Sequence, residues 1–214
     1  MMRRIDSPWL RSATTRFRSG LAVLGVLLAT AGCALPGDSS PPAQAYLLEV
    51  EALPPNPAQP VSTKTLLVTT PKAAPGFDSS RIAYTRQPLK LDYYRDSLWS
   101  DTPARMLQPV LVRALETTGA FLAVVTPPAP GGVNLRLDVD IIRLQQEFMR
   151  QPSQVRLTAR VKVIDSPSGR VMASRVFDAT APAPSEDAEG AARGANAAVR
   201  TLLTELIPFV LEQR

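Results

Sequence analysis

Apolar residues occupy every second position from Leu135 to Ile141 and again from Val155 to Val163. This alternation is typical of a β-strand with one buried and one solvated face, so the two stretches predict a long hairpin joined through residues 147–153. The polar positions are acidic on the first strand and basic on the second: Asp138, Asp140, Arg156, Arg160 and Lys162. We therefore expect ion pairs across the solvated face of this hairpin.

Two other stretches repeat their apolar residues at helical spacing. The first follows Thr102, a residue suited to the N-cap, and Pro103, suited to the first helical position, and its apolar stripe extends to Leu115. The second is expected to begin at Ser185 as the capping residue, with acidic residues in its first turn. Pro208 is expected to kink or end this second helix.

Shorter runs of apolar and β-branched residues, separated by Pro- and Gly-rich breaks, predict further strands. They span residues 46–50, 64–70, 81–86, 89–94, 121–125 and 170–180. The third and fourth runs are expected to pair as a hairpin, because only Gln87 and Pro88 separate them. Residues 46–214 are therefore expected to fold as one domain of strands and two helices.

The first 32 residues have the three regions of a secretory signal peptide. Five arginines precede an apolar run at residues 21–30, which is shorter than the ~20 residues that a membrane-spanning helix needs. The following Thr30-Ala31-Gly32-Cys33 resembles the bacterial lipobox, which predicts that signal peptidase II cuts between Gly32 and Cys33 and that Cys33 is acylated. The alternative is cleavage by the ordinary signal peptidase, which would leave a free cysteine near the new terminus.

Acylated Cys33 would anchor the mature protein in a membrane, and the Pro-rich residues 33–45 would form its tether. In enterobacterial lipoproteins, an aspartate directly after the acylated cysteine favours retention in the inner membrane. This chain has Ala34 at that position, so its resemblance to those lipoproteins favours the outer membrane, with the domain in the periplasm.

Charge and composition exclude several classes of function. The formal net charge is +5, but five of the 24 basic residues and one of the 19 acidic residues lie in residues 1–32, so the remainder is nearly neutral and we expect no nucleic-acid partner.

The chain has no histidine and one cysteine, which excludes a histidine-containing catalytic triad, an imidazole-bound metal and an internal disulfide. We expect no enzymatic activity, no metal and no cofactor. Asp138 and Asp140 could bind a hard cation in principle, and ion pairing is the alternative for them.

Two groups of apolar residues are candidates for contact with a partner. Phe148 and Met149 lie in the loop of the long hairpin between polar neighbours, where a partner, a second protomer or a membrane could cover them. The alternative is that this loop folds back onto the domain. Tyr93, Tyr94 and Trp99 could line a binding groove or, alternatively, could cover the end of the core.

The order of these features resembles the ABC-type transport auxiliary lipoproteins, the family that includes the paraquat-inducible lipoprotein C. The resemblance rests on Cys33, the Tyr46-Leu47-Leu48 run, the IAYTR and LKLDYY runs, Trp99 and the helix that begins at Pro103. It implies an α/β fold, a single three-layer domain with a mixed β-sheet flanked by helices, similar to the N-terminal domain of the translocation protein TolB. It also implies a lipoprotein that works with an MCE-domain protein, a permease and an ATPase in moving lipids or hydrophobic compounds, and that can form a homo-oligomeric ring.

Two other functions are compatible with the residues. One is a lipoprotein that assists outer-membrane assembly or lipopolysaccharide insertion, and the other is a lipid carrier with a cavity of its own.

Overall fold

The computed structural model describes residues 42–50, 62–129 and 131–214. The chain divides into two units, residues 1–41 and 42–214, and the second unit contains every strand and helix described below. The signal peptide, Cys33 and most of the predicted tether lie outside the described residues. Gln44 and Ala45, which the sequence analysis assigns to the tether, belong to a strand.

The central element of the sheet is the 13-residue strand β7 (Leu135–Glu147). On one side it pairs antiparallel with β8 (Gln154–Asp165), which pairs in turn with β9 (Val171–Pro182), so the predicted hairpin is confirmed. Along its other edge β7 pairs in parallel with three short strands in succession: β2 (Thr65–Val68), β3 (Lys72–Ala73) and β4 (Arg81–Thr85).

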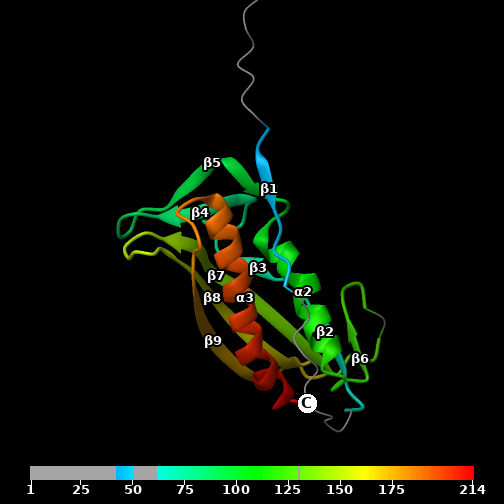
Figure 1. Ribbon diagram of the computed structural model, residues 1–214. Helices are drawn as coiled ribbons and strands as arrows, with labels where there is room; N and C mark the ends of the chain where they lie inside the picture. Colours follow the sequence, from blue (N-terminus) through cyan, green and yellow to red (C-terminus); the bar gives the residue numbers. More distant parts are fainter. Residues whose placement is uncertain (1–41, 51–61, 130) are drawn as a thin grey trace, which may run out of the picture. The chain divides into compact units, whose positions relative to one another are not determined.

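Three more strands complete the mixed sheet (Figure 1). The predicted hairpin of β4 with β5 (Asp92–Trp99) is present, and β5 begins later and extends further than the 89–94 run. Strand β1 (Gln44–Tyr46) pairs in parallel with β5, and β6 (Ala123–Val125) pairs in parallel with β2.

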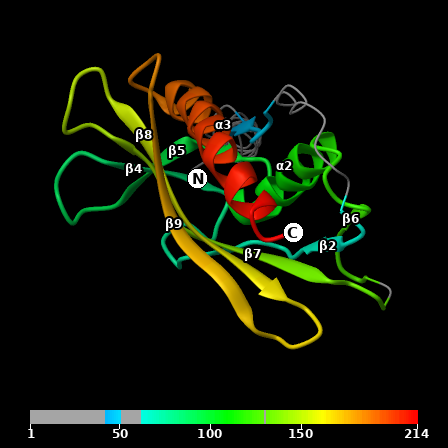
Figure 2. The same ribbon diagram turned by 90° about the horizontal axis from the view of Figure 1, so that it is seen from below.

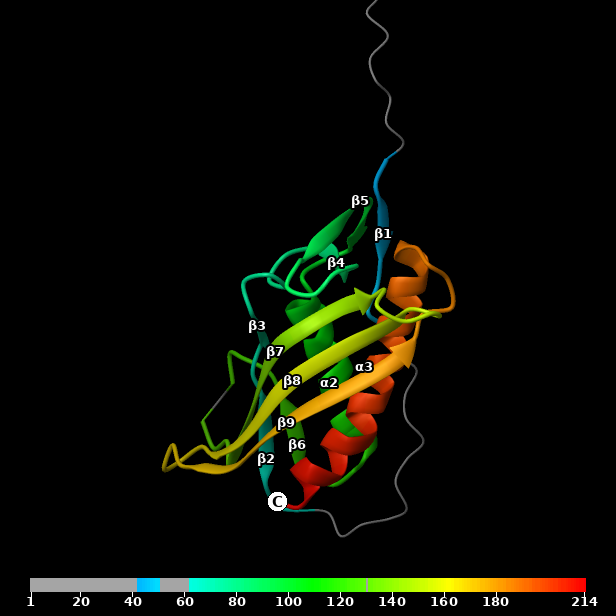
Figure 3. The ribbon, with the colours of Figure 1, turned by 90° about the vertical axis from the view of Figure 1, so that its left-hand side faces the viewer.

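Both described helices lie against the same face of the sheet: α2 (Pro103–Thr117) and α3 (Ala188–Leu211) (Figure 2). The other face of β7, β8 and β9 is open (Figure 3). The α/β class with a mixed sheet agrees with the expectation, whereas the described residues form two layers and not the three that the family resemblance implies. The alternation in β8 up to Val163 explains the difference, because the second face there carries only polar and charged side chains and has no apolar ones to bury under another helix.

The helix signals of the sequence are partly confirmed. Thr102 caps α2, because its hydroxyl accepts a hydrogen bond from the backbone N–H of Arg105. Asp187, and not Ser185, caps α3: its carboxylate accepts from the Gly190 N–H at 2.8 Å, while the Ser185 hydroxyl donates to that carboxylate. Pro208 does not end α3, which continues to Leu211.

The predicted strand 46–50 is displaced, because only Tyr46 of that run belongs to β1. Beyond β1 the extended chain is held by Asn196 of α3. The Asn196 side-chain amide donates to the Leu47 carbonyl at 3.0 Å and accepts from the Glu49 N–H at 2.7 Å. A side chain therefore supplies the partner that a neighbouring strand would otherwise provide for this segment.

The first half of helix α3 approaches the sheet closely because its buried residues, up to Ala198, are alanine and glycine. A Cβ atom built on Gly194 would lie 2.6 Å from the Cγ2 atom of Val155 on β8. Distances below 3.0 Å require one of the two elements to move, so glycine is needed at this position for contact.

We expect Gly194→Ala to lower the free energy of unfolding by about 1–3 kcal/mol, the usual cost of overpacking, although alanine favours helix formation. Urea denaturation measures it. Gly131→Ala is the matched control, because a Cβ at Gly131 meets no atom within 4 Å, and its effect should stay within about 0.5 kcal/mol. A Gly194→Ala variant as stable as the parent would contradict the close packing of α3 on β8.

Candidate interaction surface at one end of the sheet

Two loops lie at the same end of the sheet: residues 86–91 between β4 and β5, and residues 148–153 between β7 and β8 (Figure 1, Figure 2). The ends of β4 and β7 pair with each other, and the Phe148 N–H donates to the Thr85 carbonyl at 2.9 Å. Leu89 and Met149 border a groove between the loops. We call the following residues of the two loops the tip surface: Arg86, Leu89, Lys90, Phe148, Met149 and Arg150.

The tip surface exposes two large apolar side chains. Leu89 is fully exposed, and 49% of Met149 is exposed. Leu89 also has a φ of 66°, a conformation that is uncommon for a residue with a side chain. The sequence analysis identified Met149 but missed Leu89, although an apolar residue directly after Pro88 in a polar turn was a usable signal.

Phe148 is partly buried, because its ring packs against β4 and the loop that follows. The ring centroids of Phe148 and Tyr84 are 5.8 Å apart in an edge-to-face arrangement. The Arg86 guanidinium carbon lies 4.3 Å from the centre of the Phe148 ring. The loop therefore folds back as far as Phe148, as the alternative interpretation held, and leaves Met149 exposed.

The aromatic residues of β5 do not form one surface with the tip. Trp99 is 4% exposed and belongs to the core, so the expectation that it contacts a partner is corrected. The Tyr93 hydroxyl donates to the Gly76 carbonyl at 3.0 Å, and the Arg81 guanidinium lies over the Tyr93 ring. Tyr94 is partly buried, and its hydroxyl donates to the side-chain carbonyl of Gln146 at 2.6 Å. Partner contact through Tyr93 and Tyr94 stays a prediction.

A buried polar network fixes the base of the 148–153 loop. The fully buried Gln146 accepts from Tyr94 and donates to the Ser153 hydroxyl at 2.7 Å and to the Ser185 carbonyl at 3.2 Å. The Ser153 N–H donates to the Glu186 carboxylate just before α3. Burial of the Tyr94 hydroxyl raises its pKa well above the usual range. The network therefore joins β5, β7, the loop and the segment just before α3.

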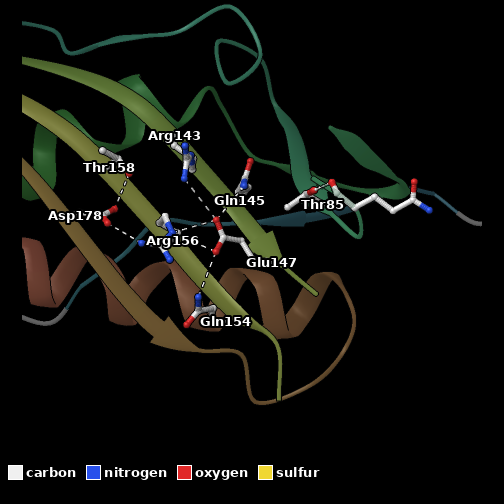
Figure 4. Close-up of polar contacts among 9 residues, drawn as sticks. Thr85, Arg143, Gln145, Glu147, Gln154, Arg156, Thr158 and Asp178 are labelled. Carbon is white, nitrogen blue, oxygen red and sulfur yellow. Dashed lines mark hydrogen bonds and ion pairs between the residues drawn. The ribbon is translucent and has the colours of Figure 1, made fainter. Parts of the chain in front are cut away.

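A second polar cluster, around Glu147, lies on the open face next to this loop (Figure 4). The Glu147 carboxylate pairs with Arg156 at 3.1 Å and with Arg143 at 3.7 Å, and Arg156 also pairs with Asp178 at 2.6 Å. Burial acts to lower the pKa of Arg156, but the hydrogen bonds and charges of Glu147 and Asp178 outweigh it and raise that pKa. Nearby, the buried Thr85 hydroxyl donates to the Gln87 carbonyl at 2.7 Å and so fixes the start of the 86–91 loop.

The remaining charges of the open face form the predicted cross-strand pairs only in part. Lys162 contacts Asp140 at 3.0 Å, which confirms a cross-strand pair, whereas Asp138 pairs with Arg136 on its own strand at 3.1 Å. Within the described part of the chain, no three side chains of the His, Cys, Asp or Glu type come together as a metal site would require. Neither described helix contains a stretch long and apolar enough to cross a membrane.

Comparison with known families assigns the domain. The model of the ABC-type transport auxiliary lipoprotein component family matches residues 46–206. The chain belongs to this family. The family resemblance found in the sequence is thereby confirmed, and the protein is an auxiliary lipoprotein component of ABC-type transport. No curated protein matches the chain.

Two solved structures share the fold. Protein XCC0632 from Xanthomonas campestris is 30% identical, with a TM-score of 0.71 over 78% of this chain and 95% of its own. An uncharacterized protein has a TM-score of 0.64 over 79% of this chain and 99% of its own at 12% identity, which shows the fold alone.

We expect Tyr94→Phe to lower the free energy of unfolding by about 1–3 kcal/mol, because it leaves the buried Gln146 carbonyl without a donor. Thermal or urea denaturation measures this loss. Tyr46→Phe is the matched control: its hydroxyl bonds to exposed Gln44, so the change should stay within about 0.5 kcal/mol. Equal effects of the two substitutions would contradict a stabilising role of the Gln146 network.

Proposed function

We propose that the protein is a membrane-anchored periplasmic lipoprotein that serves as a non-catalytic auxiliary subunit of an ABC/MCE-type transport system for lipids or hydrophobic compounds. The observation that carries this proposal is the family match over residues 46–206. The lipobox at Cys33 supports it by supplying an anchor, and Ala34 favours the outer membrane.

A non-catalytic role suits the polar groups of the described domain. The most buried carboxylate on the open face, that of Glu147, is paired with two arginines, and the buried Gln146 and Tyr94 satisfy each other. These groups hold loops in place, and a general acid or base needs a titratable group free to exchange a proton. The proposed partners are an MCE-domain protein with its permease and ATPase, and other copies of the same chain in a ring.

We expect Cys33→Ser to abolish acylation and to release the protein from the membrane, while the domain at residues 42–214 stays folded because Cys33 precedes it. Labelling with a clickable fatty acid, followed by separation of membrane and soluble fractions, measures both effects. Substitution of the adjacent residue, Ala34→Ser, is the control and should retain the label. Label on the Cys33→Ser variant would show that acylation occurs elsewhere.

The transport assignment predicts that the acylated protein, purified in mild detergent with a C-terminal tag, retains the MCE-domain subunit, the permease and the ATPase. A second lipoprotein with the same type of anchor, purified in parallel, should not retain them. Retention of a large outer-membrane β-barrel protein in their place would favour the assembly function and contradict the transport role.

A further inference from the structure

We propose that the tip surface contacts the headgroup layer of the membrane that holds the acyl chains of Cys33, with Leu89 and Met149 inserted among the headgroups. This inference rests on the proposed acylation, and goes beyond it by assigning a second, non-covalent membrane contact and an orientation of the domain.

The chemistry of the two loops suits a phospholipid surface. Each loop presents an exposed apolar side chain, Leu89 or Met149. Residues 86–91 and 148–153 contain three basic residues and no acidic one. Apolar side chains flanked by lysine and arginine are the composition of interfacial membrane contacts, because the apolar groups enter the headgroup boundary while the cations remain at the lipid phosphates.

Binding through the two loops would cost little conformational entropy, because contacts within the domain already hold them. Arg86 lies over the Phe148 ring and Lys90 pairs with Asp92 at 3.4 Å, so both cations are held beside the apolar residues. The Gln146 network holds the base of the 148–153 loop. Binding therefore does not need to immobilise a flexible loop, which would oppose it.

The chain enters the described domain in a direction compatible with a membrane contact at the tip surface. Strand β1 is parallel to β5, with Gln44 opposite Ser97, so the chain before Gln44 leads toward the start of β5 at Asp92. Asp92 directly follows the 86–91 loop. Eight residues lie between Cys33 and Pro42, and the nine steps from one to the other span about 30 Å at most. A tether of this reach allows the acyl chains and the tip surface to meet the same membrane.

A protein partner suits the tip surface less well than a membrane does. Its exposed apolar residues are two single side chains on separate loops beside cations, whereas the core of a protein interface is a continuous apolar patch depleted of charge. The other exposed large apolar side chains of the described residues lie outside the two loops, after β1, before β6 and on β9: Leu47, Leu122, Val171 and Val176.

The test uses the acylated protein with one added cysteine, because Cys33 is the only natural cysteine and its thiol is blocked by the lipid. Leu89→Cys and Met149→Cys report on the tip surface. Leu122→Cys, at an exposed apolar position before β6, and Ser168→Cys, in the turn between β8 and β9, are the controls. Each variant carries a bimane label and is reconstituted in phosphatidylethanolamine–phosphatidylglycerol vesicles that contain a lipid with a quencher near its headgroup.

We expect the labels at residues 89 and 149 to lose about half of their fluorescence, since interfacial groups are buried about 5–10 Å into the headgroup boundary, where the quencher lies. The two control labels should lose little. Equal quenching at all four positions, or none at residues 89 and 149, would overturn the proposal. Two other results would assign the tip surface to protein contact and also overturn the proposal. One is a fluorescence change at residues 89 and 149 only after transport partners are added, and the other is a change without quencher lipid as protomers associate.

Flotation of the same samples separates this inference from the proposed function. Protein that floats with the vesicles but shows no quenching at the tip contradicts only the membrane contact. Protein that does not float contradicts the acylated anchor and, with it, both proposals.

Discussion

Pairing of β7 along both of its edges is the constraint on which the rest of the domain depends. Its 13 residues hydrogen-bond to β8 on one side and to β2, β3 and β4 in succession on the other. Three segments that are too short to form a sheet by themselves are thereby aligned along one strand. The same pairing brings the end of β4 to the end of β7, which places the 86–91 and 148–153 loops next to each other.

A register shift in β7 explains why its last residues behave differently from its first. Up to Ile141 the odd-numbered side chains face the helices, but the pairing with β8 shifts between Ile141 and Arg143. After the shift Leu144 and Gln146 are buried. A β-bulge therefore turns a polar glutamine into the core, where Tyr94 and Ser153 satisfy it, and leaves Glu147 on the open face with its arginines.

The bulge in β7 connects the fold to the tip surface. Because Gln146 is buried and fully hydrogen-bonded, the loop that follows it starts from a fixed point, and Met149 is exposed on a supported loop. An apolar side chain at that position contributes nothing to the core of the described domain. Its exposure, like that of Leu89, is therefore best explained by contact outside the domain, and the absence of acidic residues from both loops directs that contact toward lipid.

The sequence by itself determined the elements whose signals are local: the β7–β8 hairpin from alternation, the start of α2 from Thr102 and Pro103, and the family from the order of its segments. It also pointed to Met149. Only the tertiary structure decided that Asp187 caps α3, that Trp99 is buried, that Phe148 packs on Tyr84 and that Leu89 joins Met149 at one end of the sheet. The physical reason is that a bulge and a set of parallel pairings between distant segments determine which side chains face the core. The periodicity within a single segment does not predict the bulge or these pairings.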